Sequence, residues 1–259
     1  MGLALAGCGG SQSPATTAVP PPPKPFRVVF PEGFTRAQMA ERVQAVAKIA
    51  FHERGVHPRI SAKTYLAASG PRRVPGFGPQ KRKLEGFLFP ATYDFLASTT
   101  SRQLVAAQLQ AFQREWHTVD LSYARSKNLT PYDVLTIASI VEREAVVPSE
   151  RKLVAAVIYN RLRDRMPLGM DSTIRYGLNV LGTRPLLESE LASDNPYNTR
   201  KFLGLPPTPI ANPGLASIEA AAHPAHVDYL YFVRKPDHRH HYFTSNYDDF
   251  LYHEHLYGY

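Results

Sequence analysis

The chain has 259 residues, of which 44% are hydrophobic and 20% are charged, a composition typical of a globular protein with one large domain or two small ones. Its formal net charge of +8 favours an anionic partner such as nucleic acid, anionic lipid or an acidic cell-wall polymer. The basic residues are scattered, with one tight cluster at residues 81–83. The sequence contains no zinc-finger spacing, aromatic RNA-binding signature or P-loop, so we do not expect a nucleic-acid partner.

The N-terminal residues indicate export. Cys8 is the only cysteine, which excludes an internal disulfide. Residues 5–8 (LAGC) resemble the lipobox of bacterial lipoproteins, in which the cysteine is lipidated. No basic residue precedes it, so we interpret residues 1–8 as a clipped signal with a lipobox. Residues 9–25 are rich in proline and lack apolar periodicity, which predicts an extended linker.

The first part of the folded chain predicts a strand and two helices. Residues 26–30 (FRVVF) are typical of a short strand. After a turn, Thr35 is suited to cap a helix that places Met39 on its apolar face. Residues 55–83, rich in Gly, Pro and Arg, predict loops or short helices, and a helix is expected over residues 101–116.

A pair of helices is the clearest prediction in the second part of the chain. Thr130 is suited to cap a helix that begins at Pro131 and ends near Val147, because Pro148 disfavours helical geometry in the residue before it. A second helix is expected over about residues 149–165.

The remaining residues combine a long loop with a helix and two strands. Residues 166–214 are rich in Pro, Gly and Asn and predict a stiff, ordered loop that borders a cleft. We expect a helix over residues 215–222 and strands over 228–234 and 240–244. Helices and strands do not alternate regularly, so the fold class predicted is α+β.

Glu142 and Glu144 lie on the first helix of the predicted pair, and both flank its polar stripe. On a helix, Glu142 shares a face with Leu135 and Ala138, whereas Glu144 shares one with Ile140. A carboxyl group held against apolar side chains resists ionisation, which suits a general acid that protonates a glycosidic oxygen. Two glutamates without a catalytic role, placed at the border between the polar and apolar faces and paired with neighbouring arginines, would show the same pattern. Periodicity does not choose between the two glutamates.

Metal and nucleophile chemistry are poorly supported. The histidines lack the His-Glu-x-x-His and Cys-x-x-Cys spacings of zinc sites, so we expect no metal. There is no Gly-x-Ser-x-Gly motif, and the single cysteine lies in the tail.

Several consecutive blocks of the sequence resemble the endolytic murein transglycosylases of the MltG/YceG-like family. The match runs in order over roughly residues 26–250. The blocks are PEGFT at 31–35, LEGFLFPATYDF at 84–95, ASIVEREAVVPSERKLVAAVIYNRL at 138–162, MPLGMDSTIRYGL at 166–178, NPYNT at 195–199, GLPPTPIANPGLASIEAAAHP at 204–224, DYLYFV at 228–233 and HYFT at 241–244.

The resemblance implies a lyase that needs no cofactor. It would cleave the MurNAc–GlcNAc β-1,4 bond within nascent peptidoglycan strands, leave 1,6-anhydro-MurNAc ends and terminate glycan elongation. Glu142, the first Glu of the IVE-x-E block, would be the acid and base, and Glu144 would be structural or supporting. The residues implied to line the glycan groove are Glu85, Glu144, Glu150, Asn160, Asp171, Thr173, Tyr197, Asn198, Thr199, Asn212 and His241.

The same resemblance implies a domain organisation, a location and partners for the chain. We expect a small N-terminal α/β subdomain at residues 26–83 and a catalytic YceG-like domain at residues 84–259. The LysM-like module usual in the family is absent or reduced, and a lipobox-like stretch stands where the family usually has a transmembrane helix. The expected location is the cell membrane on the side of the cell wall, with lipid attachment at Cys8 and peptidoglycan synthase or divisome proteins as partners. A hydrolytic muramidase and a non-catalytic wall-binding scaffold are the alternatives.

Overall fold

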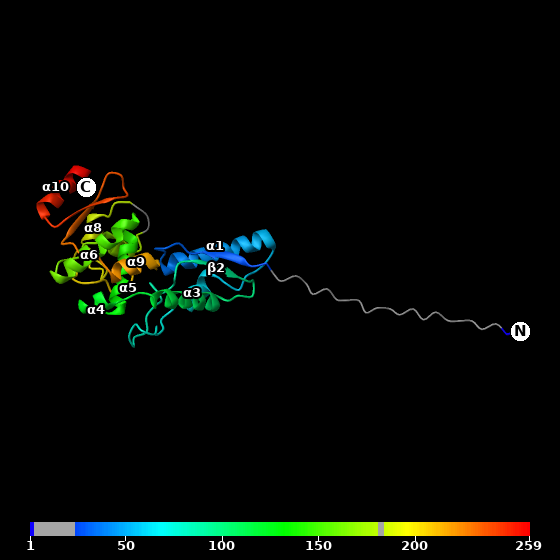
Figure 1. Cartoon of the computed structure of the whole chain (residues 1–259). Coiled ribbons are helices and arrows are strands. Elements are labelled where there is room, and N and C mark those ends of the chain that lie inside the picture. The colour runs from blue at the N-terminus through cyan, green and yellow to red at the C-terminus, as the bar shows by residue number, and fades with distance from the viewer. Residues whose placement is uncertain (3–23, 181–183) are drawn as a thin grey trace.

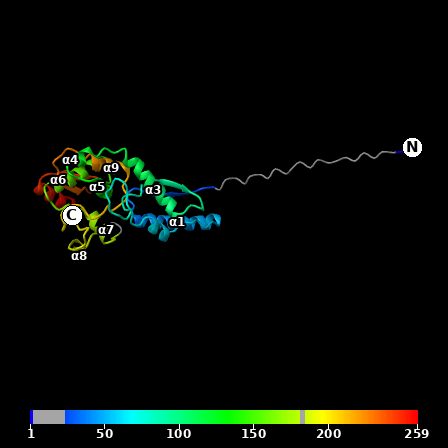
Figure 2. The ribbon, with the colours of Figure 1, turned by 90° about the horizontal axis from the view of Figure 1, so that it is seen from below.

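The computed structural model describes residues 1–2, 24–180 and 184–259. Residues 26–180 and 184–259 form two lobes side by side (Figures 1 and 2). Cys8 and most of the predicted linker lie outside the described residues. Among the residues described, no helix is both long and apolar enough to cross a membrane. The mixture of helices and short strands confirms the α+β prediction.

The N-terminal lobe contains a two-stranded antiparallel sheet covered by helices. The register pairs Phe26 with Phe95 and Val29 with Thr92. Two helices that are distant in sequence, α2 and α3, pack on each other in this lobe. Its elements are β1 (Phe26–Val29), α1 (Arg36–Arg54), α2 (Ala62–Ala68), β2 (Thr92–Phe95) and α3 (Ser101–Trp116).

The C-terminal lobe surrounds one buried helix, α5, whose main neighbour is α9. A second antiparallel hairpin pairs Tyr231 with Thr244 and Arg234 with His241. The elements are α4 (Ser122–Ser126), α5 (Pro131–Glu144), the 3-10 turn η1 (Pro148–Glu150), α6 (Arg151–Arg163), α7 (Asp171–Gly177), α8 (Glu188–Leu191), α9 (Leu215–Ala222), β3 (Tyr231–Arg234), β4 (His241–Thr244) and α10 (Tyr247–Tyr257).

Capping residues begin the long helices where the sequence predicts them. The Thr35 and Thr130 hydroxyls accept the backbone N–H of Gln38 and Asp133, and each partner side chain accepts the threonine N–H in return. These reciprocal bonds satisfy backbone groups that a helix start leaves without partners.

The middle of the expected polar stripe on α5 is buried, whereas Arg143 at its end is exposed. Every residue from Val134 to Val141 is buried, including Thr136 and Ser139. The Thr136 hydroxyl donates to the Tyr132 carbonyl, and the Ser139 hydroxyl donates to the Thr136 carbonyl while accepting the N–H of Ile210. A hydroxyl group that forms a hydrogen bond to the backbone can be buried at little cost in free energy. For this reason the hydroxyl residues of the predicted polar stripe do not face solvent.

Several element boundaries differ from the expectation. The helix expected to reach Val147 ends at Glu144, because Ala145 is extended, and the second helix covers residues 151–163 after η1. The segments 171–177 and 188–191 form short helices inside the predicted loop. Neither α4, α10 nor the strand β2 was expected from sequence.

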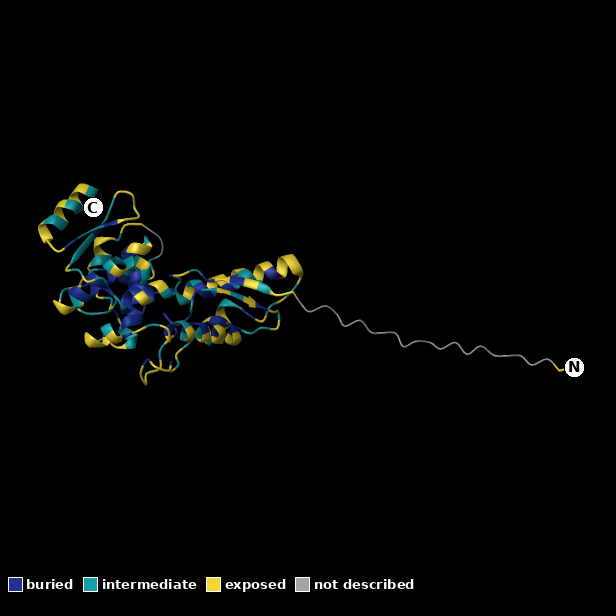
Figure 3. Cartoon of the chain, viewed as in Figure 1, coloured by how far each residue is buried: buried dark blue, intermediate teal, exposed yellow. Residues whose placement is uncertain are grey.

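A continuous hydrophobic core joins the two lobes (Figure 3). Met39 and Phe112 of the N-terminal lobe belong to the same buried cluster as Leu135 and Ile158. The boundary expected between residues 83 and 84 stays a prediction, and β1 and β2 form one sheet from segments on either side of it.

Candidate active site at the end of helix α5

Glu142 lies in the last turn of α5 and is half-buried. Its Oε2 accepts the backbone N–H of Gly214 at 3.0 Å, and Gly214 is the N-cap of α9. The positive end of the α9 dipole therefore faces this carboxyl group. The turn that contains Gly33 covers the other side, where a Cβ on Gly33 would lie 3.5 Å from Glu142 Cγ.

Glu32 brings a second carboxyl group to the same place. Its side chain lies against Gly214 so closely that a Cβ there would be 1.8 Å from Glu32 Oε1. Arg151 Nη2, at the start of α6, is 4.0 Å from Glu32 Oε2. Burial and the charge of Glu142 raise the pKa of Glu32, while Arg151 opposes that rise.

Glu144 has a different environment from Glu142. Its Oε1 accepts the backbone N–H of Ser172 at the start of α7, at 3.4 Å. The two glutamates that periodicity left equivalent are thus separated by tertiary contacts. Glu142 contacts the α9 start and the turn at Gly33, whereas Glu144 contacts α7.

A cavity of about 680 Å³ lies next to this region, and we call it the basic groove. Six cations line it, and Glu85 is the one acidic residue among its lining residues. The hydroxyl of Ser172, which also lines it, is buried without a hydrogen-bond partner in the described part of the chain. Its cationic members are Arg36, Lys81, Arg82, Lys83, Arg143 and Arg175.

Glu85 lies at the inner side of the basic groove and is buried. Its carboxyl accepts the N–H of Arg36 at 2.8 Å, the Asn212 amide at 3.0 Å and the Tyr176 hydroxyl at 3.0 Å. Burial raises the pKa of Glu85 to about 7, although these hydrogen bonds oppose the rise. The sequence places Glu85 in the glycan groove, and the structure brings it to the wall of the basic groove.

Aromatic side chains form another wall of the basic groove. The rings of Tyr176 and Tyr197 are 5.1 Å apart, and the Tyr197 hydroxyl lies 2.8 Å from the Thr208 hydroxyl. The Arg82 guanidinium lies 4.1 Å from the centre of the Tyr132 ring, a cation–π contact. The groove therefore combines stacking surfaces with cations, which suits sugar rings that carry anionic groups.

Most of the other residues expected in the groove are buried and bonded within the protein. Thr173 and Thr199 join their hydroxyls at 2.9 Å, and Asn198 donates to the Leu191 and Ser193 carbonyls. Asp171 is different, since it forms a half-exposed ion pair with Arg200.

The last three expected residues connect the C-terminal hairpin to η1 and α6. Asn160 donates to the carbonyls of Val227 and Tyr229. Glu150 accepts both the backbone N–H of His241 at 3.0 Å and a bond from its ring Nδ1 at 2.8 Å. A direct contact of these buried side chains with glycan stays a prediction.

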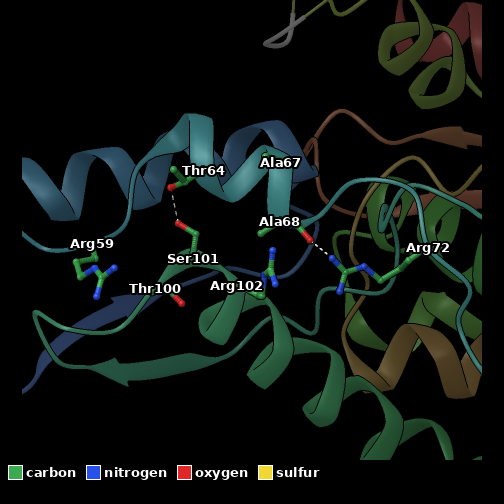
Figure 4. A pocket seen from close by; sticks show the side chains of 8 residues that line it. All are labelled: Arg59, Thr64, Ala67, Ala68, Arg72, Thr100, Ser101 and Arg102. Carbon is green, nitrogen blue, oxygen red and sulfur yellow. Dashed lines mark hydrogen bonds between the residues drawn. The ribbon is translucent and has the colours of Figure 1, made fainter.

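A second cavity, of about 550 Å³, lies between α2 and α3 in the N-terminal lobe (Figure 4). Arg59, Arg72 and Arg102 line it together with hydroxyl and alanine residues, and none of its lining residues is acidic. It has no group that could protonate a leaving oxygen, so it is not the candidate catalytic centre.

No group of three or more His, Cys, Asp and Glu side chains suited to a metal ion occurs among the residues that the structure describes.

Sequence reasoning missed Glu32, Arg151 and the role of Gly214. Glu32 lies within the PEGFT block, but the block was interpreted only as a turn before a helix. The signal available in the sequence was a charged residue next to a glycine. Only the structure shows that this glycine has a positive φ of 76° and lies over Glu142.

Comparisons with known proteins agree with the resemblance noted in the sequence. The model of the YceG-like family matches residues 13–255. An endolytic murein transglycosylase of Streptococcus pneumoniae R6 is 34% identical over 247 residues, which cover 90% of this chain and 45% of the relative. An endolytic murein transglycosylase of Bacillus subtilis 168 is 41% identical over 155 residues, which cover 60% of this chain and 43% of the relative. The chain thus spans about half the length of these curated relatives.

A solved structure is also similar. The crystal structure of a yceG-like protein from Listeria monocytogenes superimposes with a TM-score of 0.70 at 30% sequence identity. The match covers 87% of this chain and 75% of the Listeria chain.

Proposed function

The chain belongs to the YceG-like family, and from this premise we propose that it is an endolytic murein transglycosylase. It would cleave the β-1,4 bond between MurNAc and GlcNAc within a nascent peptidoglycan strand and leave a 1,6-anhydro-MurNAc end. The observation that carries this proposal is the position of Glu142, half-buried at the N-terminus of α9 and next in sequence to Arg143, which lines the basic groove.

In the proposed reaction one carboxyl group acts twice. Protonated Glu142 gives its proton to the glycosidic oxygen as the bond from that oxygen to C1 breaks. The C6 hydroxyl oxygen of the same MurNAc then bonds to C1, and its proton returns to Glu142. The Gly214 N–H, 3.0 Å from Oε2, stabilises the carboxylate that exists between the two transfers.

The basic groove is the proposed binding surface for the strand. Tyr132, Tyr176 and Tyr197 line the groove and bring aromatic surface to sugars. The surrounding cations attract the carboxylates of lactyl groups and stem peptides. The Ser172 hydroxyl offers a hydrogen bond that nothing in the described part of the chain uses.

The proposed location is the cell-wall side of the membrane. The lipobox-like residues 5–8 support lipid attachment at Cys8, and peptidoglycan synthase or divisome proteins are proposed partners because the substrate is nascent glycan. Radiolabelled palmitate fed to expressing cells tests this directly: the wild-type protein should be labelled and a Cys8→Ala variant should not. An unlabelled wild type would contradict lipid attachment.

Conversion of Glu142 to glutamine tests the catalytic assignment. Gln has almost the same shape but cannot transfer a proton, so Glu142→Gln should lose about 10²–10⁴-fold in rate. The products of peptidoglycan strands are identified by mass spectrometry, and wild type should yield anhydro ends. Glu53→Gln, at an exposed position of α1, is the control and should stay within a few-fold of wild type.

Three results would contradict the proposal in different ways. Reducing MurNAc ends without any anhydro product would indicate a hydrolytic muramidase. A Glu142→Gln variant as active as wild type would exclude Glu142 as the acid, and wild type without any activity on strands would favour a wall-binding scaffold.

A further inference from the structure

Two carboxyl groups and one guanidinium meet around Gly214. The Gly214 N–H donates to Glu142 Oε2, and Glu32 lies against its Cα, where a Cβ would be 1.8 Å from Glu32 Oε1. Arg151 Nη2 lies 4.0 Å from Glu32 Oε2. Only a glycine allows both carboxyls to approach the start of α9 in this way, since any larger side chain would occupy the space of Glu32.

We infer that Glu32 is a positioning residue for the reaction, a half-exposed carboxyl group beside Arg151 that controls when Glu142 holds its proton. This inference rests on the proposed function. It adds a second carboxyl to a mechanism that otherwise uses one. Glu32 does not itself exchange a proton with the substrate.

The physical reason lies in the two tasks of Glu142. It must begin the reaction protonated, and after the first transfer it must be basic enough to take the proton of the C6 hydroxyl. A neighbouring negative charge favours the protonated form of a carboxyl group and increases the basicity of its carboxylate. Two carboxyls in one site titrate as a pair, so the proton affinity of the pair depends on both.

The other charged groups around the pair act in the opposite direction or point elsewhere. Arg151 of α6 faces Glu32, and its side chain is 16% exposed. Arg143 of α5 donates to the Gly33 carbonyl at 3.4 Å, and the positive end of the α9 dipole faces Glu142. Glu144 is turned toward Ser172 of α7. Glu32 is therefore the negative charge that offsets these cations at Glu142.

The test is the dependence of the rate on pH. On peptidoglycan strands, the rate of wild type should fall as pH rises, when Glu142 loses its proton before reaction. Removal of the Glu32 charge in Glu32→Gln should move this fall by about one unit to lower pH, with a roughly tenfold lower rate on the falling part of the profile. At the acidic plateau the two rates should be within a few-fold.

Three further variants make the result specific. Glu32→Asp keeps the charge and should restore the wild-type profile. Arg151→Gln removes the opposing charge, so the decrease in rate should occur at higher pH. If Glu32→Gln does not fold, this variant still tests whether the charges around Glu142 set the pH at which the rate decreases. Glu53→Gln, an exposed change of the same charge in α1, should leave the profile unchanged.

The outcomes separate this inference from the proposed function. Wild type without anhydro product contradicts the proposed function. Active wild type, inactive Glu142→Gln and a Glu32→Gln profile that superimposes on wild type would overturn the role of Glu32 alone. A Glu32→Gln rate lowered equally at every pH would also overturn it, because that result indicates a purely structural residue.

Discussion

At the scale of single residues, Glu85 is an acid whose burial should make the stability of the protein depend on pH. Its pKa is raised to about 7 in the fold, from an ordinary value of 4.5. Between these two values the unfolded chain releases the proton and the folded protein keeps it, so the free energy of unfolding falls as pH rises from about 4.5 to about 7. The shift corresponds to roughly 3 kcal/mol.

Glu85→Gln, which resembles the protonated acid, should remove this dependence. Urea unfolding at pH 4.5 and pH 7 measures it for wild type and variant. We expect wild type to lose roughly 3 kcal/mol more than the variant over this interval, and Glu53→Gln, exposed in α1, to behave like wild type. Equal losses for wild type and Glu85→Gln would show that Glu85 titrates normally in the fold.

At the scale of elements, a buried pair of side chains joins the C-terminal hairpin to the start of α6. His241 begins β4 and Glu150 ends η1, and their side chains are 2% and 9% exposed. Removal of the His241 side chain leaves the buried Glu150 carboxyl with the backbone N–H of residue 241 as its remaining partner there, at a cost of about 3 kcal/mol. His241→Ala should therefore lower the free energy of unfolding by about that amount, measured by urea unfolding.

The exposed His255 of α10 supplies the matched control. His255→Ala should change the free energy of unfolding by no more than about 0.5 kcal/mol. Similar small effects for both variants would mean that the His241–Glu150 pair does not secure the hairpin.

At the scale of the whole molecule, the net charge is +8. We expect the cations that line the basic groove to contribute most to the binding of anionic strands. Lys81 and Lys83 line this groove and are exposed. Exposed charges attract anionic strands across water, and salt screens that attraction over about 10 Å at 0.1 M. Replacement of both lysines by glutamine should weaken binding of uncrosslinked peptidoglycan several-fold at low salt, and the difference should vanish near 0.5 M.

Lys48→Gln with Lys63→Gln makes the same change of charge on exposed positions of α1 and α2, outside the lining of the groove. Binding is measured by sedimentation of strands with intact stem peptides. Equal effects of the two double variants would indicate attraction by net charge alone, without a special role of the groove.

Local sequence patterns determined the fold class, the caps at Thr35 and Thr130, the helix over residues 101–116 and the general position of the C-terminal hairpin. These features depend on contacts between residues close in sequence, such as the capping bonds of a helix. The family resemblance added the choice of Glu142, which stays a prediction until the variants are measured.

Only the tertiary structure decided which groups stand next to Glu142. Residues 32, 142 and 214 are far apart in the chain, and helix periodicity contains no information about contacts between distant segments. Packing of α9 on α5 brings Gly214 to Glu142, and the turn after β1 adds Glu32. The sequence by itself thus determined a helix with two equivalent glutamates, and the fold made them different, because the environment of a carboxyl group depends on neighbours that only packing supplies.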